Sequence, residues 1–324
     1  MFNETRGVKP TSLNQRMSRM NRREFVCGAM AFGLTKYGQA NPDPLRRFKL
    51  GVITDEVNRD LPEALEFVKE FGLEWIELRN VWGTYVMDFN QEQIRLAKAM
   101  ISDHGLKVSC ICTPFLKIQF PGSTPIRGNY KKSPLAEQFE ILKRAVDVAH
   151  ALDAKNIRTF SFARCPEPES LFQAAVDNIG KAAEIVAAED LRIVLENIYD
   201  GTICTGKECA RLCKAIPNRA FGLIWDPPNA YGLSGEQPYP GMYEELDPSR
   251  IYHVHLKDAV WKGDHHEWAV VGEGELDIPG QLTALLRDRV DCTVSLETHA
   301  NLNGSREAAS RAGMPVLIEM MRKA

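Results

Sequence analysis

Residues 135–162, LAEQFEILKRAVDVAHALDAKNIRTFSF, contain a helix pattern and a strand pattern separated by a three-residue link. Apolar residues in the first half recur at spacings of three and four, which defines one face of an α-helix over residues 135–152: Leu135, Phe139, Leu142, Ala145, Val146 and Ala149. After Asp153-Ala154-Lys155, the run 156–162 is short, with apolar and β-branched residues that are typical of a strand. The stretch therefore predicts a helix that leads directly into a strand.

The same alternation continues on both sides of this stretch. Strand-like runs occur at eight places, residues 50–57, 75–81, 107–113, 156–162, 192–198, 221–225, 250–256 and 293–298. Amphipathic stretches lie between them, including 61–71, 91–104 and 170–188, and a last helix is expected at 307–322. Eight β-α units predict one (β/α)8 TIM barrel over residues 41–324. A doubly wound open sheet is the alternative, but no GxGxxG loop follows the first strand.

The connections between the predicted elements differ in length according to their direction. Helix-to-strand links are short, such as Asp153-Ala154-Lys155 and Asp190-Leu191, whereas strand-to-helix links are long, at residues 114–132, 227–240 and 257–277. Barrel enzymes carry their chemistry on the loops that follow the strands. The loop lengths therefore predict the active face before any catalytic residue is considered.

The first forty residues differ from the remainder. Arg22-Arg23 precede a mostly apolar stretch at 25–34, and the small residues of 38–40 suit a cleavage site. This pattern resembles a twin-arginine (Tat) signal peptide, with a disordered basic N-terminus as the alternative. We therefore expect export, to the periplasm, of a mature barrel comprising residues 41–324. No run of 18 apolar residues occurs, so no membrane span is expected in the mature protein.

Charge and cysteine content exclude several other classes of protein. Segment 1–40 contains seven of the 40 basic and two of the 43 acidic residues, so the remainder has a net charge of −8. An acidic domain is a poor ligand for nucleic acid, because phosphate neutralisation needs clustered Lys and Arg. The eight cysteines contain no CxxC pair, and buried thiols are expected rather than a zinc ribbon or a disulfide framework.

Polar residues follow the last four predicted strands. Glu196 ends the fifth strand, Asp226 the sixth, His255 the seventh and Glu297 the eighth. Because these positions converge on one rim of a barrel, they form a mixed oxygen and nitrogen site for one divalent cation. Mn²⁺, Mg²⁺, Co²⁺ and Zn²⁺ all suit such ligands.

Several short motifs together resemble the sugar phosphate isomerase/epimerase family, which has a xylose isomerase-like TIM barrel. They are LEN (195–197), WDPPN (225–229), HVHLKD (253–258), VGEGELDIPG (271–280) and SLETH (295–299), supported by GVITDEV (51–57) and IELR (76–79). The resemblance covers roughly residues 48–324. It implies that Glu196, Asp226, His255 and Glu297 bind one metal ion, usually Mn²⁺, and that His253 lies deeper in the barrel.

Such a site implies proton-transfer chemistry on carbohydrates. A divalent cation that bridges a carbonyl and a neighbouring hydroxyl acidifies the C–H between them and stabilises an enediolate. Glu196 and Glu297 are the expected catalytic pair, one removing a proton and the other returning it, which gives a sugar isomerase or epimerase acting on a keto sugar or related polyol. The alternative is a lyase or dehydratase, in which the same enolate expels a β leaving group from a keto-sugar or 3-keto-glycoside.

The sequence departs from the well-studied ketose 3-epimerases at three positions. Thr202, Asn229 and Trp261 stand where those enzymes carry a Glu, a His and an Arg that clamp the substrate. The HLKD motif instead is similar to that of inosose dehydratases and keto-sugar lyases, and Lys257 is a third expected catalytic residue, with a rim ion pair as the alternative.

Four further residues are expected to bind the substrate: Glu77, Asn229, Trp261 and His299. A structural pairing with Arg79 is the alternative for Glu77. The loop residues His265, His266 and Trp268 are candidates for covering a sugar ring, with a solvated loop equally compatible.

Other functions of the same barrel are less compatible with the sequence. An apurinic endonuclease would need a histidine-rich multi-zinc cluster and a basic groove, which the net charge of −8 contradicts. A non-catalytic sugar-binding barrel would not need two opposed ligand glutamates. The expected partner is a small carbohydrate, and a homo-oligomer is compatible with the sequence.

Overall fold

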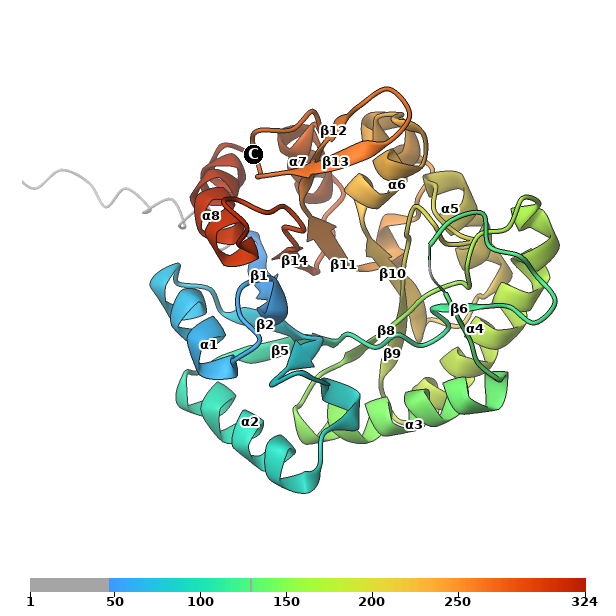
Figure 1. Ribbon diagram of the computed structural model, residues 1–324, viewed down its shortest axis with the longest axis horizontal. Coiled ribbons are helices and arrows are strands. Elements are labelled where there is room, and N and C mark those ends of the chain that lie inside the picture. The colour runs from blue at the N-terminus through green and yellow to red at the C-terminus, as the bar shows by residue number, and fades with distance from the viewer. Residues whose placement is uncertain (1–46, 129) are drawn as a thin grey trace, which may run out of the picture. The chain divides into compact units, whose positions relative to one another are not determined.

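The computed structural model describes residues 47–128 and 130–324, so the predicted signal segment 1–40 lies outside the described residues. Eight parallel strands close into a barrel in the order β1-β14-β11-β10-β9-β8-β5-β2 (Figure 1). They are β1 Lys49–Ile53, β2 Trp75–Leu78, β5 Lys107–Ile111, β8 Asn156–Thr159, β9 Arg192–Glu196, β10 Phe221–Trp225, β11 Ile251–Leu256 and β14 Thr293–Leu296. The predicted TIM barrel is confirmed, since each strand lies within or overlaps its predicted run.

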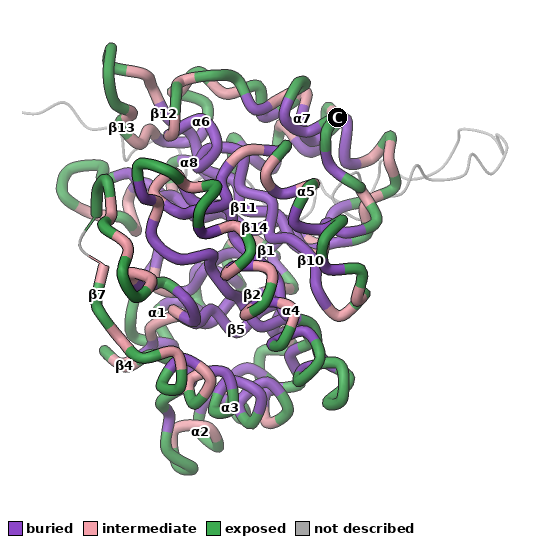
Figure 2. The backbone as a smooth tube through the Cα atoms, turned by 90° about the vertical axis from the view of Figure 1, so that its right-hand side faces the viewer, coloured by how far each residue is buried: buried purple, intermediate pink, exposed green. Residues whose placement is uncertain are grey.

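Helices surround the barrel, as Figure 1 shows. They are α1 Leu61–Glu70, α2 Gln91–Asp103, α3 Leu135–Ala151, α4 Phe172–Ala188, α5 Gly206–Ala215, α6 Pro227–Ser234, α7 Ile278–Arg287 and α8 Arg306–Lys323. Two of them begin with a capping box, in which Asn90 and Gln93 or Thr205 and Glu208 exchange side-chain and backbone hydrogen bonds. Apolar residues of the helices and strands form one hydrophobic cluster. Figure 2 shows buried backbone at the centre of the molecule, where the strands lie.

Some predicted strands are too long at their C-terminal ends. The run 156–162 forms a strand only over Asn156–Thr159, because the amides of Phe160 and Phe162 donate to the carbonyls of Phe115 and Leu116 in the loop after β5 (both 3.0 Å). Phe162 also has a φ of 67°, which is incompatible with a continuing strand. The chain therefore leaves the barrel early and brings loops over its C-terminal end.

The barrel interior contains both apolar and charged side chains, and the charged ones lie toward one end. Its small apolar cluster consists of Cys110, Cys112, Val194 and Ile224, whereas the larger cluster lies between strands and helices. Toward the C-terminal ends of the strands the interior contains buried charged side chains instead, among them Glu77, Arg158, His255, Lys257 and Glu297. Such charges persist in an interior only when they are paired or bind an ion, so this end is the candidate for the functional site.

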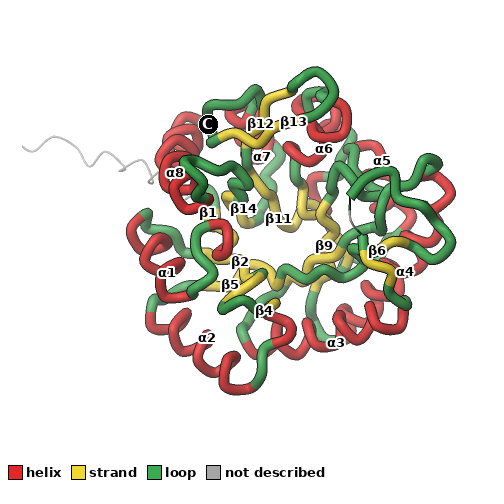
Figure 3. The backbone as a smooth tube through the Cα atoms, viewed as in Figure 1, coloured by secondary structure: helices red, strands yellow, loops and turns green. Residues whose placement is uncertain are grey.

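The long segment between β11 and α7 is not a plain loop, because it forms the hairpin of β12 (Asp258–Trp261) and β13 (His266–Ala269) (Figure 3). Asp258 holds this hairpin and the segment after it. Its carboxylate accepts hydrogen bonds from the backbone N–H groups of Ala259, Gly272, Gly274 and Leu276, at 2.9 to 3.3 Å. A Cβ on Gly274 would lie 2.0 Å from Asp258 Oδ1, so only glycine fits against this carboxylate.

The cysteines and helices agree with the other sequence expectations. All seven cysteines of the described part are free and buried, as the absence of a CxxC pair predicted. Within residues 47–128 and 130–324, no helix has both the length and the apolar character that a membrane crossing requires.

Candidate metal centre

Four strands position the four predicted metal ligands. Glu196 is the last residue of β9 and His255 lies on β11, whereas Asp226 and Glu297 directly follow β10 and β14. Asp226 is also the N-cap of α6, where its Oδ1 accepts from the Asn229 backbone N–H (2.8 Å) and leaves Oδ2 for other contacts. One ligand atom from each of the four residues lies within 4.8 Å of the others, and all four side chains are buried.

The chemistry of His255 fits a metal ion at this point. Its Nδ1 is buried without a hydrogen-bond partner among the described residues. Around it stand three carboxylate oxygens, Glu297 Oε2 at 3.4 Å, Asp226 Oδ2 at 3.6 Å and Glu196 Oε1 at 3.7 Å. An orphaned imidazole nitrogen that faces three carboxylates offers one nitrogen and three oxygen donors, the set that borderline divalent cations prefer. The four residues therefore fit a metal ion.

Glu77, at the C-terminal end of β2, sets the orientation of His255. Its Oε2 lies 3.1 Å from His255 Nε2 and its Oε1 lies 2.7 Å from His253 Nε2. A proton on Nε2 leaves Nδ1 as an acceptor, which is the form that binds a metal. In the metal-free protein, burial lowers the pKa of His255 but the neighbouring carboxylates raise it well above its ordinary value, so a metal ion on Nδ1 would replace a proton. Burial raises the pKa of Glu77, but the charges of His253 and His255 in that state outweigh it and hold the pKa well below its ordinary value. Glu77 thus contacts the histidines rather than Arg79, and its substrate role stays a prediction.

Glu77→Gln should weaken Mn²⁺ binding about 10- to 100-fold, because partners of metal ligands contribute that much to affinity. A glutamine keeps the size of the side chain but removes the charge and one of the two oxygens that face His253 and His255. Titration of Mn²⁺ by electron paramagnetic resonance measures the effect. Glu74→Gln is the control, since Glu74 is exposed just before the same strand. Equal affinity in both variants would contradict the assigned orienting role.

Lys257 lies fully buried beside the same carboxylates. Its Nζ contacts Asp226 Oδ2 and lies 2.7 Å from Glu297 Oε2. Burial lowers the pKa of this ammonium, but the charges of Asp226 and Glu297 raise it above its ordinary value. Lys257 therefore places a buried positive charge between two of the predicted metal ligands. A metal ion and Lys257 would share two ligand oxygens.

Two arginines outside the predicted site hold the two ligand glutamates. Arg158, on β8, donates from Nη1 to Glu196 Oε2 (2.8 Å), and Arg79 donates from Nη1 to Glu297 Oε1 (3.0 Å). Each glutamate thereby turns one oxygen to an arginine and the other to His255. Burial raises the pKa of Glu196, but the Arg158 charge and the hydrogen bond and charge of His255 together outweigh it and lower the pKa to about 2. The position of Arg158 inside a predicted strand was the sequence signal that could have identified it as part of the site.

Arg79 and Glu56 extend this network to the edge of the site. Arg79 Nη2 lies 2.5 Å from Glu56 Oε1, which also accepts from Arg306 Nη1 (2.9 Å), and His299 Nδ1 lies 3.3 Å from the same oxygen. Glu56, Glu297 and His299 could together hold a second ion. However, the two guanidinium groups on Glu56 oppose a further cation there, so this cluster is better described as an ion-pair network.

The stability of the metal-free protein should depend on Glu56 in a defined pH window. Burial raises the pKa of Glu56, but a hydrogen bond with His299 and the charges of His299 and Arg79 lower it from 4.5 to about 2. The stabilisation from a lowered pKa is complete above pH 4.5 and is lost as the pH falls through about 2. Urea unfolding should give a gap between wild type and Glu56→Gln that is widest above pH 5 and shrinks toward pH 2. A gap that stays constant would disprove this assignment.

The structure distributes the other predicted substrate-binding residues differently. His299, with 24% of its side chain exposed, lies with Nε2 3.5 Å from Glu297 Oε1. Asn229 is buried and donates from Nδ2 to Glu196 Oε1 (3.2 Å), so it supports a ligand. Trp261 lies on β12, where its Nε1 donates to the Gly263 carbonyl (2.9 Å) and its ring packs on Tyr231. It is Trp268 whose ring lies 5.3 Å from Lys257 Nζ.

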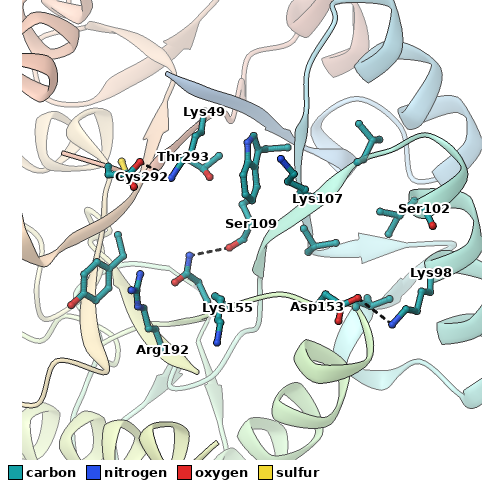
Figure 4. Close-up of a pocket in the computed structure, with 18 residues that line it drawn as sticks. Lys49, Lys98, Ser102, Lys107, Ser109, Asp153, Lys155, Arg192, Cys292 and Thr293 are labelled. Atoms are coloured by element: carbon teal, nitrogen blue, oxygen red, sulfur yellow. Dashed lines mark hydrogen bonds and ion pairs between the residues drawn. The ribbon is translucent and has the colours of Figure 1, made fainter. Parts of the chain in front are cut away.

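A hollow of about 510 Å³ lies at the opposite end of the barrel from these residues (Figure 4). Its lining includes residues at the starts of the strands, such as Lys49, Lys107 and Arg192. These cations already have partners, since Lys49 pairs with Asp291 (2.5 Å), and Lys107 and Arg192 lie over the rings of Trp75 and Tyr252. Barrel chemistry is carried at the other end, so this hollow is not the candidate active site.

The fold and the ligand geometry agree with the family comparison. A family model described as Xylose isomerase-like TIM barrel matches residues 65–320, and the chain belongs to this family. No curated protein matches the sequence.

Solved structures with the same fold include proteins of several activities. The IOLI protein with a binding zinc atom has a TM-score of 0.69 at 16% identity, over 85% of this chain and 99% of that one. The probable 3-DHS dehydratase AsbF from Bacillus anthracis has a TM-score of 0.65 at 18% identity, over 83% and 98%. The 3-keto-D-glucoside 4-epimerase YcjR from E. coli has a TM-score of 0.62 at 16% identity, over 86% and 100%. At these identities the likeness establishes the fold, among neighbours that include epimerases and a dehydratase.

Proposed function

We propose that the protein is a divalent-metal-dependent isomerase or epimerase that acts on a keto sugar or a related polyol. The observation that carries the proposal is the buried set of Glu196, Asp226, His255 and Glu297, whose ligand atoms converge at the functional end of the barrel. Zn²⁺, Mg²⁺, Co²⁺ and Mn²⁺ all suit this donor set, and we propose Mn²⁺ in the first place. The zinc in the IOLI structure supports a metal at this fold.

The residues of the site have distinct roles in this proposal. When bound, the ion would polarise a carbonyl and its neighbouring hydroxyl, which acidifies the C–H between them. Glu196 and Glu297 lie at the ends of β9 and β14, which β10 and β11 separate, so they reach a substrate from different directions. One carboxylate removes the proton and the other returns one at the opposite face or the adjacent carbon. Hydrogen bonds from Arg158 and Arg79 keep these carboxylates oriented.

A lyase or dehydratase is the second candidate, and Lys257 favours it. Its ammonium lies in direct contact with Glu297, which places a proton donor next to the expected base. In an elimination the base takes the C–H proton, the electron pair forms the C=C bond, and the C–O bond to the leaving group breaks. Lys257 would give its proton to the departing oxygen. The AsbF dehydratase and the YcjR epimerase both have this fold, which supports a lyase and an epimerase as the two candidate functions.

A proton NMR time course in D₂O distinguishes these functions. The full chain is loaded with Mn²⁺ and incubated with a panel of free ketoses and 3-keto-glucosides. Deuterium that appears in a stereoisomer or positional isomer of the starting sugar supports the isomerase or epimerase. Release of water or an aglycone with a new enone supports the lyase. Sugar binding without any exchange would overturn both and favour a non-catalytic sugar-binding barrel.

We further propose that the protein is exported to the periplasm by the Tat pathway. The twin arginines Arg22 and Arg23 with the apolar stretch after them support this, and an exported enzyme would meet unphosphorylated sugars. Cell fractionation tests it, since the R22K/R23K variant should remain in the cytoplasm while the wild type reaches the periplasm. Equal distribution of the two proteins would contradict export by this pathway.

A further inference from the structure

Four aromatic rings form a continuous row on the C-terminal end of the barrel, which we call the aromatic wall: Tyr199, His266, Trp268 and His299. Neighbouring ring centroids along the row are 4.7, 4.3 and 5.5 Å apart. Tyr199 comes from the loop after β9, His266 and Trp268 from β13, and His299 from the loop after β14. All four side chains are only partly buried, although each packs on another ring. Partly exposed aromatic rings that line a polar site are typical of ligand-binding surfaces.

The wall begins at the metal centre and extends away from it. At the near end, His299 Nε2 lies 3.5 Å from Glu297 Oε1 and the Trp268 ring lies 5.3 Å from Lys257 Nζ. At the far end, the Tyr199 ring lies 6.3 Å beyond that of Trp268. One sugar ring at the metal centre would contact only the near end. The Tyr199–His266 pair would then remain without a ligand.

The wall is held in place before any ligand binds. The Asp258 carboxylate fixes the base of the hairpin that carries His266 and Trp268. His266 Nδ1 donates to the Gly232 carbonyl (3.2 Å), and a Cβ on Gly232 would lie 2.9 Å from the His266 ring, so glycine allows this approach. Burial lowers the pKa of His266, which keeps the imidazole neutral near pH 7 and suited to apolar contact.

The other tryptophan of the hairpin provides a contrast. Trp261 satisfies its indole N–H within the hairpin itself, by donating to the Gly263 carbonyl. Among residues 47–128 and 130–324, the indole N–H of Trp268 has no such acceptor, so it is available to a hydroxyl group of a ligand. The indole of Trp261 therefore belongs to the internal packing of the hairpin, whereas the indole of Trp268 belongs to the aromatic wall beside Lys257.

We infer that the aromatic wall binds the second, non-reacting unit of a glycoside, so that the substrate is a keto-glycoside with a sugar or aromatic aglycone rather than a free keto sugar. This inference rests on the proposed function, because it takes the reacting ring to lie at the metal centre. The reacting unit contacts His299 and Trp268, and the aglycone lies against His266 and Tyr199. Stacking of the apolar C–H face of a sugar, or of an aryl group, on these rings supplies the affinity.

Ligand-observed NMR titration tests the inference without turnover. Phenyl β-D-glucopyranoside, methyl β-D-glucopyranoside and D-glucose are titrated into the Mn²⁺-loaded full chain. The phenyl glucoside should bind the wild type about tenfold more tightly than the methyl glucoside, which corresponds to about 1.4 kcal/mol. Tyr199→Ala should abolish this difference, whereas Trp261→Ala, which removes an aromatic ring outside the wall, should retain it. Binding of D-glucose should be unchanged in Tyr199→Ala.

Two results would overturn the inference. The first is equal or undetectable binding of the two glucosides to the wild type, and the second is a preference for the phenyl glucoside that survives Tyr199→Ala. Either can occur while the D₂O experiment still detects exchange with a free ketose, in which case the proposed function stands and only the aglycone site fails. Conversely, a preference for the phenyl glucoside without any hydrogen exchange would support the aglycone site and contradict the proposed catalytic function.

Discussion

Glu297→Gln should reduce kcat/KM for hydrogen exchange at least about 10³-fold, since it removes both a metal ligand and one member of the expected acid–base pair. In the structure, the Glu297 carboxylate contacts the predicted ligand His255, the buried Lys257 and Arg79. Its Oε2 faces His255 Nδ1 and Lys257, and its Oε1 accepts from Arg79. A glutamine cannot serve all of these contacts, because its NH₂ group would face either Arg79 or Lys257, both of which are donors.

The loss should also be visible without a substrate. Removal of a partner of a metal ligand already weakens metal binding 10- to 100-fold, so removal of a ligand itself should weaken Mn²⁺ binding at least about 100-fold. Glu273→Gln is the control, because Glu273 is exposed on the segment after β13 and keeps the same change in net charge. A Glu297→Gln variant with wild-type exchange rate and wild-type Mn²⁺ affinity would disprove the assigned site.

Lys257→Met should destabilise the metal-free protein by about 3–5 kcal/mol, the usual effect of removing one partner from a buried ion pair. Methionine preserves most of the volume, but Asp226 and Glu297 then keep their charges in the interior without the ammonium between them. Addition of Mn²⁺ should restore much of the lost stability, because the ion supplies positive charge to the same two carboxylates. The rise in melting temperature on Mn²⁺ binding should therefore be larger in the variant than in the wild type.

Differential scanning calorimetry with and without Mn²⁺ measures both effects. Lys262→Met, at the exposed tip of the hairpin, is the matched control and should leave both melting temperatures unchanged. If the metal-free Lys257→Met protein has the same melting temperature as the metal-free wild type, the contacts of Lys257 with Asp226 and Glu297 contribute nothing to stability. Turnover separates the two candidate functions further, since an elimination that uses Lys257 as its acid should lose activity more completely than an epimerisation.

The fold was predictable because its signals are local and repeated. The helix spacing around Leu142 and the short link before Asn156 have counterparts in several units, although the link from α6 to β11, residues 235–250, is much longer. A closed ring of eight strands follows from counting the strand-like runs. The strand ends were less predictable, since Phe160 and Phe162 leave the barrel to bond with a loop about 45 residues earlier. Such long-range hydrogen bonds have no pattern in the sequence around them.

The candidate site was predictable where it depends on strand ends. The positions of Glu196, Asp226, His255 and Glu297 follow from their place after consecutive strands, and the structure brings all four together. The partners of these ligands come from other segments of the chain, since Arg158 lies 38 residues before Glu196 and Arg79 lies 218 residues before Glu297. No local spacing relates them to the glutamates. The prediction of Trp261 instead of Trp268 as the tryptophan near the site has a similar cause. The β12–β13 hairpin, which the sequence did not predict, decides which indole lies beside Lys257.

The anchoring of the hairpin by Asp258 divides this segment into a part that cannot change and a part that can. The carboxylate bonds to backbone amides at 259, 272, 274 and 276, but not to the exposed tip at 262–265. Insertions or deletions at the tip would therefore alter the reach of the hairpin over the barrel while its base stays in register with the metal ligands. Laboratory evolution aimed at new substrates would do best to vary the length of this tip first.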